Sequence, residues 1–218
     1  MIALALRIAV VFGLMLAVLS IAAGRADVWG FWAWVIVMWL TSLGIHLWLR
    51  RIDPDLLAER MRPPSDRDRP TRWLMLLPLL AAFVVTGLDV RLGWSTVPLP
   101  VQIAGLVLVV LGILFAGWVL VTNPFASSAV RIQQDRGQHV ISTGPYALVR
   151  HPMYLAVLVV CLGSGPALGS WWGGLAFLTL LPVFVRRTLL EDRMLNDELA
   201  GYREYAARVR WRVVPHVF

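Results

Sequence analysis

The chain has 218 residues, of which 59% are hydrophobic and 15% charged, and its formal net charge is +7. An average soluble domain has about 25% charged residues, so this composition argues against a soluble globular protein. All lysine and arginine charge comes from arginine, and there are eleven tryptophans, a residue enriched at membrane interfaces. The arginines lie between long apolar runs, which favours a membrane surface or an anionic ligand over a nucleic acid as partner.

Four apolar runs in the first part of the chain each approach the roughly 20 residues needed to cross a bilayer. They cover residues 2–23, 28–49, 73–88 and 97–121. No basic cluster precedes the first run, so we expect a retained membrane helix and not a cleaved signal peptide. The length fits a single membrane domain, 1–218, whose first part, 1–122, holds these four helices.

A fifth apolar run, residues 153–185, is too long for one straight crossing. Its middle contains Gly163, Gly165 and Pro166, followed by Gly169 and Ser170, which is a strong turn signal. We therefore predict a helical hairpin of two shorter crossings. The fold class is an all-α polytopic membrane bundle of six transmembrane segments, or five if one arm of the hairpin does not cross.

Arginines gather in three stretches. Residues 50–72 hold seven, the connection before the hairpin holds three, and the tail from Arg186 holds seven, whereas the alternate connections hold only Arg25 and Arg91. Because basic residues are enriched in cytoplasmic loops, we expect these three stretches and both termini to be cytoplasmic. Six crossings place all three on the same face.

Two segments outside the apolar runs have helical features. Residues 54–61 predict a short surface helix with Asp53 as its cap and Pro54 in its first turn, followed by a charged linker at 63–70. The tail from 186 to about 210 predicts an amphipathic helix. Its apolar stripe consists of Leu195, Leu199, Tyr202, Ala206 and Val209.

Residues 142–154 form the first piece with chemical potential. Pro152 biases His151 toward an extended backbone and suits the first position of a helix. We expect a helix that begins at Pro152, with Arg150, His151 and Tyr154 at its N-terminus, where unpaired N–H groups and the helix dipole favour an anion. This group is either an interfacial anchor or part of a binding pocket.

The second piece is the start of the tail helix, which holds Arg187, Glu191 and Asp192. Arg187 and Glu191 are four residues apart and can form an ordinary surface ion pair. The hairpin, however, returns the chain to the face it left, so both acidic residues can lie near His151.

Other polar residues give weaker signals. Asn123 is either a helix cap or a pocket residue. The four histidines and Cys161 show no metal-ligand spacing, so we expect no metal site.

The two pieces and the residues that follow them resemble a known family. Before the hairpin the sequence reads Gly144-Pro145-Tyr146, Arg150-His151-Pro152 and Tyr154, and after it come Arg187, Glu191-Asp192, Leu195, Gly201-Tyr202, Tyr205, Arg210 and Pro215. This pattern, over about residues 120–218, resembles the isoprenylcysteine carboxyl methyltransferase family, which is related to membrane phospholipid methyltransferases. Residues 123–128 and 130–137 look like those of bacterial members, so we expect a bacterial inner-membrane protein.

The resemblance implies methyl transfer from S-adenosylmethionine to a lipophilic or lipidated acceptor that enters from the bilayer, with a carboxylate or thiol as the methylated group. It implies that His151, Tyr154 and Glu191 contact the cofactor, with Asp192 beside them as a further cofactor-binding residue, and that Arg187 holds or polarises the acceptor. Arg150 suits the cofactor's carboxylate, Tyr146 belongs to the same binding segment, and His151 is the titratable group available to a protonated acceptor.

Two residues depart from the family pattern. Asp192 replaces a glutamate, and Ala156 replaces a glycine, where its methyl group can narrow the pocket.

Two other functions remain open: an NADPH-dependent membrane reductase, although no phosphate-binding glycine motif is present, and a non-catalytic membrane subunit. Binding of S-adenosylhomocysteine or of NADPH would separate the three. Membrane lipids are expected neighbours, and the oligomeric state is not indicated by the sequence.

Overall fold

The structure, a computed structural model, describes residues 2–61, 69–127 and 130–218. Over these ranges the chain is helical and contains no β-strand. Within the described residues, five helical segments are long and apolar enough to cross a membrane. The predicted all-α membrane bundle is thereby confirmed, and the chain is an integral membrane protein.

The four apolar runs of the N-terminal part form four long helices. These are α1 (Ile2–Ala23), α2 (Trp29–Ile52), α4 (Arg69–Leu92) and α5 (Leu99–Thr122). α2 and α4 extend past the apolar runs because polar residues such as Arg50 and Arg91 continue the helices at their ends.

The short helix predicted after α2 is α3 (Pro54–Arg60). The Asp53 carboxylate accepts a hydrogen bond from the Leu56 N–H at 2.8 Å, and Pro54 occupies the first turn, as predicted. Most of the predicted linker at 63–70 lies outside the described residues, and Arg69 and Pro70 already belong to α4.

The predicted hairpin is confirmed. Its first arm is α6 (Pro152–Ala167), and its second arm consists of α7 (Trp171–Leu178) followed by α8 (Leu181–Glu198). Gly169 has φ +81° in the turn, and the Ser170 hydroxyl caps α7 by accepting from the Gly173 N–H at 2.7 Å. The turn follows Pro166, which lies in the last turn of α6.

The predicted boundaries of the tail helix are wrong. The sequence placed one helix over 186 to about 210, but α8 begins inside the hairpin at Leu181 and ends at Glu198. The chain then turns at Gly201, which has φ +81°, into α9 (Tyr202–Arg208). Leu199, the C-cap of α8, is extended, and glycine at position 201 adopts the left-handed conformation of the turn at little cost.

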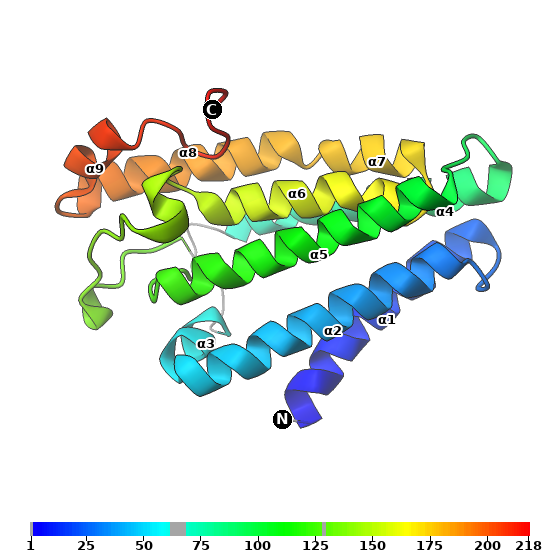
Figure 1. Cartoon of the computed structure of the whole chain (residues 1–218), viewed down its shortest axis with the longest axis horizontal. Coiled ribbons are helices and arrows are strands. Elements are labelled where there is room, and N and C mark those ends of the chain that lie inside the picture. Colours follow the sequence, from blue (N-terminus) through cyan, green and yellow to red (C-terminus); the bar gives the residue numbers. More distant parts are fainter. Residues whose placement is uncertain (1, 62–68, 128–129) are drawn as a thin grey trace.

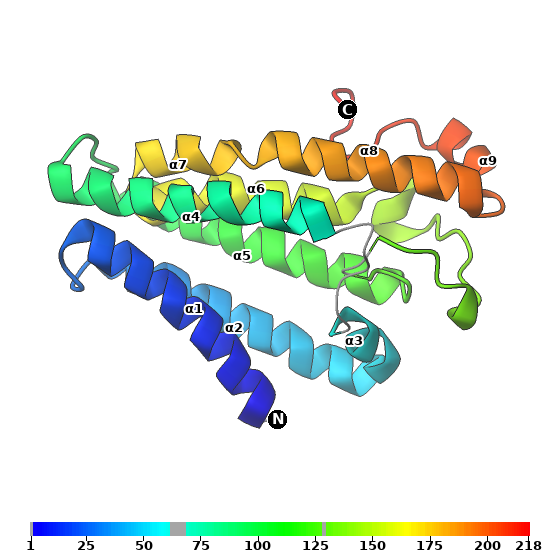
Figure 2. The ribbon, with the colours of Figure 1, turned by 180° about the vertical axis from the view of Figure 1, so that it is seen from behind.

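Small residues allow α5 and α6 to pack with their backbones close together. A Cβ atom placed on Gly105 would lie 2.6 Å from the Ala167 nitrogen, and one on Gly163 would lie 2.7 Å from the Gly105 oxygen. Such contacts are typical of membrane helix pairs. Figure 2 shows that α1 and α2 instead form a pair that diverges from this central layer.

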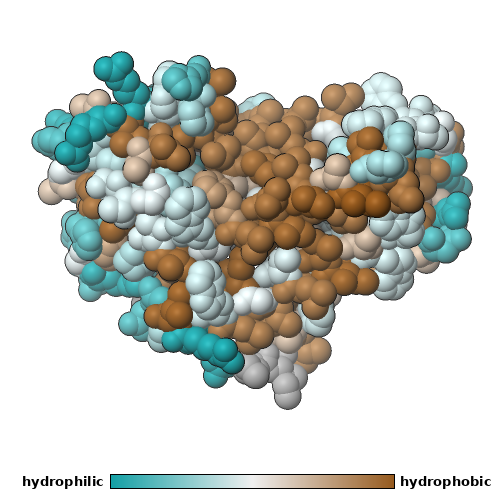
Figure 3. All heavy atoms as spheres, in the orientation of Figure 1, coloured by the Kyte–Doolittle hydropathy of each residue, from teal (hydrophilic) through white to brown (hydrophobic). Residues whose placement is uncertain are grey.

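The connections lie at two different ends of the bundle. α3, residues 130–151 and residues 199–218 lie together at one end, which we call the arginine-rich end, and the short turns lie at the other (Figure 1). A hydrophobic band crosses the surface between more hydrophilic ends (Figure 3). The arginine-rich stretches therefore share one end, as the count of crossings predicted.

Candidate functional site

A cavity of about 430 Å³ lies at the arginine-rich end, within the range of roughly 300–1,000 Å³ that is usual for small-molecule sites. Its apolar lining includes Met75 of α4, Val157 of α6 and Phe184 of α8. Its polar lining consists of Arg60, Asn123, Arg131, Tyr146, Arg150, His151, Tyr154, Arg187 and Glu191, among others.

The two sequence pieces meet at this cavity. His151 is the residue before α6, which begins at Pro152 as predicted, and α8 brings Glu191 and Asp192 back beside it. His151 Nε2 lies 3.1 Å from Asp192 Oδ1, and His151 Nδ1 lies 4.0 Å from Glu191 Oε1. The hairpin thus joins residues that are forty positions apart in the sequence.

Tyr154 connects Arg187 to Glu191. Arg187 Nε donates to the Tyr154 hydroxyl at 2.8 Å, and that hydroxyl donates to Glu191 Oε2 at 2.6 Å. The Glu191 side chain is 30% exposed, so its carboxylate faces the cavity and can accept further hydrogen bonds. The row Arg187–Tyr154–Glu191 places a cation, a hydroxyl and an anion along one wall.

Asp192 is the centre of a buried network behind this wall. Arg150 binds its carboxylate with two hydrogen bonds, from Nε at 2.9 Å and from Nη2 at 3.0 Å. Tyr202 donates to Oδ1 at 2.9 Å, and Arg212 Nε donates to Oδ2 at 3.0 Å. Unlike the other six residues predicted for the site, Asp192 does not line the cavity.

Arg150 holds the end of α9 as well as Asp192. Its Nη1 donates to the carbonyl oxygens of Val209 and Arg210 at 3.0 and 3.1 Å. Its backbone N–H donates to the Trp211 oxygen at 2.9 Å, so the C-terminal segment runs alongside the residues that precede α6. These contacts occupy the guanidinium that we expected to bind the cofactor's carboxylate.

Tyrosines form the part of the site nearest to α5. Burial raises the pKa of the Tyr146 and Tyr205 hydroxyls, which keeps them neutral, and Tyr205 donates to the Tyr146 carbonyl at 2.7 Å. Asn123 ends α5 and lines the cavity, so both interpretations of this residue are correct. Ala156 is not among the lining residues, because it is buried where α6 packs against Gly112 of α5.

Sequence reasoning missed the part of the site that comes from α3 and α4. Arg60 lines the cavity and donates to the Ala126 oxygen at 2.8 Å, and burial lowers the pKa of its guanidinium. The neighbouring Glu59 is buried and accepts from Arg131 Nε at 2.9 Å, which ties α3 to the loop after α5. No local sequence pattern marks Arg60 as a cavity residue, because its place there depends on how α3 packs against the loop after α5.

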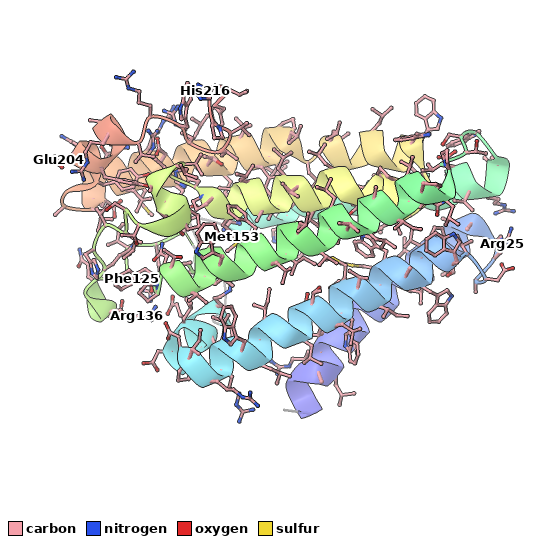
Figure 4. The ribbon with its side chains drawn as sticks, in the orientation of Figure 1. Arg25, Phe125, Arg136, Met153, Glu204 and His216 are labelled. Atoms are coloured by element: carbon pink, nitrogen blue, oxygen red, sulfur yellow. The ribbon has the colours of Figure 1, made fainter. Side chains whose placement is uncertain are left out.

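Figure 4 shows how the loop after α5 extends this end of the molecule. Phe125 and Arg136 lie together on that loop, with the Arg136 guanidinium carbon 5.8 Å from the centre of the Phe125 ring. Met153 lies inward at the start of α6, and Arg25 lies at the opposite end of the bundle. The loop therefore forms the outer wall of the cavity.

Residues 101–200 match the family described as phospholipid methyltransferase. The match includes residues 151–198, that is His151 and all of α6–α8, and therefore also Tyr154, Arg187 and Glu191. The resemblance to membrane methyltransferases is confirmed over this part of the chain. In addition, a stretch of 84 residues is 33% identical to the cobalt-zinc-cadmium resistance protein CzcN of Cupriavidus metallidurans. This stretch covers 37% of this chain and 38% of that protein.

Proposed function

We propose that the protein transfers a methyl group from S-adenosylmethionine to a lipophilic acceptor at the arginine-rich end, which we expect to face the cytoplasm. The row Arg187–Tyr154–Glu191, in a cavity built largely by the segment that matches the phospholipid methyltransferases, carries this proposal. The cavity lies where a water-soluble cofactor and a lipid can both arrive.

The residues present fit the cofactor. Glu191 offers a partly exposed carboxylate that can accept hydrogen bonds from an ammonium group or from ribose hydroxyls. Tyr154 and His151 supply polar atoms beside it, and the cavity volume of about 430 Å³ suits a molecule of this size. When bound, the cofactor supplies an electrophilic methyl group on a sulfonium centre.

The apolar part of the lining fits an acceptor with a hydrocarbon chain. Met75 of α4 and Phe184 of α8 belong to helices that the bilayer surrounds, so a chain can approach between these two helices. Arg187 follows Phe184 by one helical turn and can hold an acidic head group there by charge. A carboxylate or a thiolate is already nucleophilic, whereas a neutral thiol can transfer its proton to His151.

Methyl transfer is an in-line displacement that depends mainly on alignment and on the exclusion of water. α3 is held to the loop after α5 by the Glu59–Arg131 ion pair at 2.9 Å and by the hydrogen bond from Arg60 to Ala126. These contacts close the side of the cavity away from α6 and α8. The chain's own residues therefore supply a wall that limits the access of water.

Titration of S-adenosylhomocysteine into detergent-purified protein tests the proposal. We expect micromolar binding in the wild type that Glu191→Ala and His151→Ala abolish. Glu204→Ala is the matched control, because Glu204 is an exposed residue of α9 at the same end of the bundle that does not line the cavity (Figure 4). A folded, monodisperse wild type that binds NADPH but not S-adenosylhomocysteine would reject the methyltransferase in favour of a reductase.

A further inference from the structure

The acceptor capacity of Asp192 is fully used within the protein. Oδ1 lies 2.9 Å from Arg150 Nε, 3.1 Å from His151 Nε2 and 2.9 Å from the Tyr202 hydroxyl. Oδ2 accepts from Arg150 Nη2 and Arg212 Nε, both at 3.0 Å. A carboxylate offers about four lone-pair positions. The four arginine and tyrosine donors already use these positions, so none is left for the ammonium or hydroxyl groups of a ligand.

The neighbouring Glu191 differs in its surroundings. The Asp192 side chain is 6% exposed and lies behind the cavity wall, whereas the Glu191 side chain is 30% exposed and lines the cavity. The two adjacent carboxylates therefore have different roles. Glu191 can contact a ligand, whereas Asp192 can act only through the residues that it holds.

The residue that Asp192 holds at the cavity is His151. A carboxylate beside Nε2 favours the proton on that nitrogen, because the hydrogen bond of one ring nitrogen sets the tautomer. Nδ1 then points toward Glu191, 4.0 Å away. The imidazole thus presents a defined nitrogen to the same wall that carries the Arg187–Tyr154–Glu191 row.

Asp192 also ties this imidazole to the C-terminal segment. Arg212 binds the carboxylate through its side chain, and its backbone oxygen accepts from the His151 N–H at 2.7 Å. The Arg212 guanidinium carbon also lies 5.5 Å from the centre of the Phe218 ring. Residues 209–218 are therefore in contact with the site from the side opposite the cavity.

We propose that Asp192 is a positioning residue that fixes the His151 imidazole, with Nε2 toward its carboxylate and Nδ1 toward Glu191, and that Arg212 couples this arrangement to the C-terminal segment. The inference rests on the proposed function, since it assigns His151 its orientation for the cofactor site. It differs from the expectation that Asp192 contacts the cofactor.

The tautomer of His151 tests the proposal directly. Nitrogen-15 NMR of histidine-labelled protein in detergent is practical because the chain has four histidines, and His151→Gln identifies the relevant signal. In cofactor-free wild type we expect His151 protonated on Nε2. In Asp192→Asn we expect the Nδ1-protonated form to appear, together with a loss of S-adenosylhomocysteine affinity of about tenfold, as for one lost hydrogen bond.

Two further variants keep the test valid if Asp192→Asn folds poorly. Asp192→Glu retains the carboxylate, so the Nε2-protonated form and most of the affinity should return. Arg212→Gln removes one partly exposed ion pair, and we expect a loss of affinity of up to about fivefold. Arg208→Gln is the matched control, since it removes the same charge from an exposed position of α9 and should leave both readouts unchanged.

A wild-type tautomer in a folded Asp192→Asn variant would overturn the proposal. If that variant also lost affinity, Asp192 would contact the cofactor directly. The tautomer is measured without cofactor, so a wild type that binds no S-adenosylhomocysteine would reject the proposed function and leave the positioning role of Asp192 open to the same measurement.

Discussion

Two buried aspartates lie at opposite ends of the bundle in contrasting surroundings. Asp89 of α4 is 0% exposed and accepts hydrogen bonds from the backbone N–H and hydroxyl of Ser95 and from the hydroxyl of Ser170. Asp192 of α8 accepts from two arginines and a tyrosine and lies beside the His151 imidazole. All donors to the first carboxylate are neutral, whereas two arginines bind the second.

The difference shows what each carboxylate holds together. Asp89 joins the turn between α4 and α5 to the turn of the hairpin, and no residue of the described cavity lining lies beside it. Asp192 joins the start of α6, α8, α9 and the C-terminal segment directly behind the cavity. Removing either one should destabilise the bundle, but only the loss of Asp192 should change ligand binding.

The largest effect is expected from Asp192→Ala. This change leaves the Arg150 side chain, which is 6% exposed, without its carboxylate. The loss of one partner of a buried ion pair costs about 3–5 kcal/mol of unfolding free energy. Circular dichroism during detergent unfolding measures this cost, and titration should show no S-adenosylhomocysteine binding. An unchanged unfolding transition would contradict the assignment of Asp192 as the centre of the network.

Asp89→Asn should have a smaller effect, restricted to stability. The amide keeps one acceptor oxygen but turns an NH₂ group toward donors, so we expect a cost of about 1–3 kcal/mol. The same unfolding measurement applies. Affinity for S-adenosylhomocysteine should equal that of the wild type, and a loss of affinity without a loss of stability would show that the two ends of the bundle are coupled.

Ser170→Ala tests the Asp89 end from its other partner. The serine hydroxyl both caps α7 and donates to Asp89, and the loss of a helix cap costs about 1–2 kcal/mol. Thermal unfolding followed by tryptophan fluorescence provides the readout. Thr179→Ala is the control variant, because Thr179 is exposed at the other end of α7. Equal stability of the two variants would contradict a stabilising role for the contact between Ser170 and Asp89.

The smallest predicted effect is a pH dependence that belongs to the Asp192 end. Burial raises the pKa of Tyr146, Tyr202 and Tyr205 above the ordinary value of 10.0. In the unfolded chain these tyrosines lose protons near pH 10 while the folded chain keeps them, so the unfolding free energy falls as the pH rises. Between pH 8 and pH 10 we expect a loss of about 1 kcal/mol.

Absorbance of tyrosinate at alkaline pH checks the cause. The folded protein should show little tyrosinate at pH 10, and denaturation at that pH should release it. Tyr205→Phe should reduce the pH dependence of unfolding, whereas substantial tyrosinate in the folded protein at pH 10 would contradict the burial of these hydroxyls.

The membrane helices were predictable because their signal is local. A run of apolar residues fixes a crossing by its length, and Gly169 with Ser170 fixes the turn of the hairpin. The break between α8 and α9 was not predicted. The stripe from Leu195 to Val209 fits one helix, but the backbone becomes extended at Leu199 and left-handed at Gly201, which divides the segment into α8 and α9.

The candidate site was predictable where two motifs flank the hairpin, since the turn brings His151 and Glu191 together whatever the rest of the fold does. The contributions of Arg60 and Met75 were not predictable, because α3 and α4 reach the cavity through packing that no local pattern records. The sequence also could not show that Arg150 and Asp192 bind each other, as pairing across 42 positions depends on the whole bundle.

The length of α6 has a consequence for the surrounding lipid. Its 16 residues rise about 24 Å, less than the roughly 30 Å of an average hydrocarbon core. Hydrophobic mismatch of this kind is met by a thinner bilayer or by polar ends that lie below the head groups. Since His151 immediately precedes α6, this short helix sets the depth at which the imidazole lies relative to the lipid head groups.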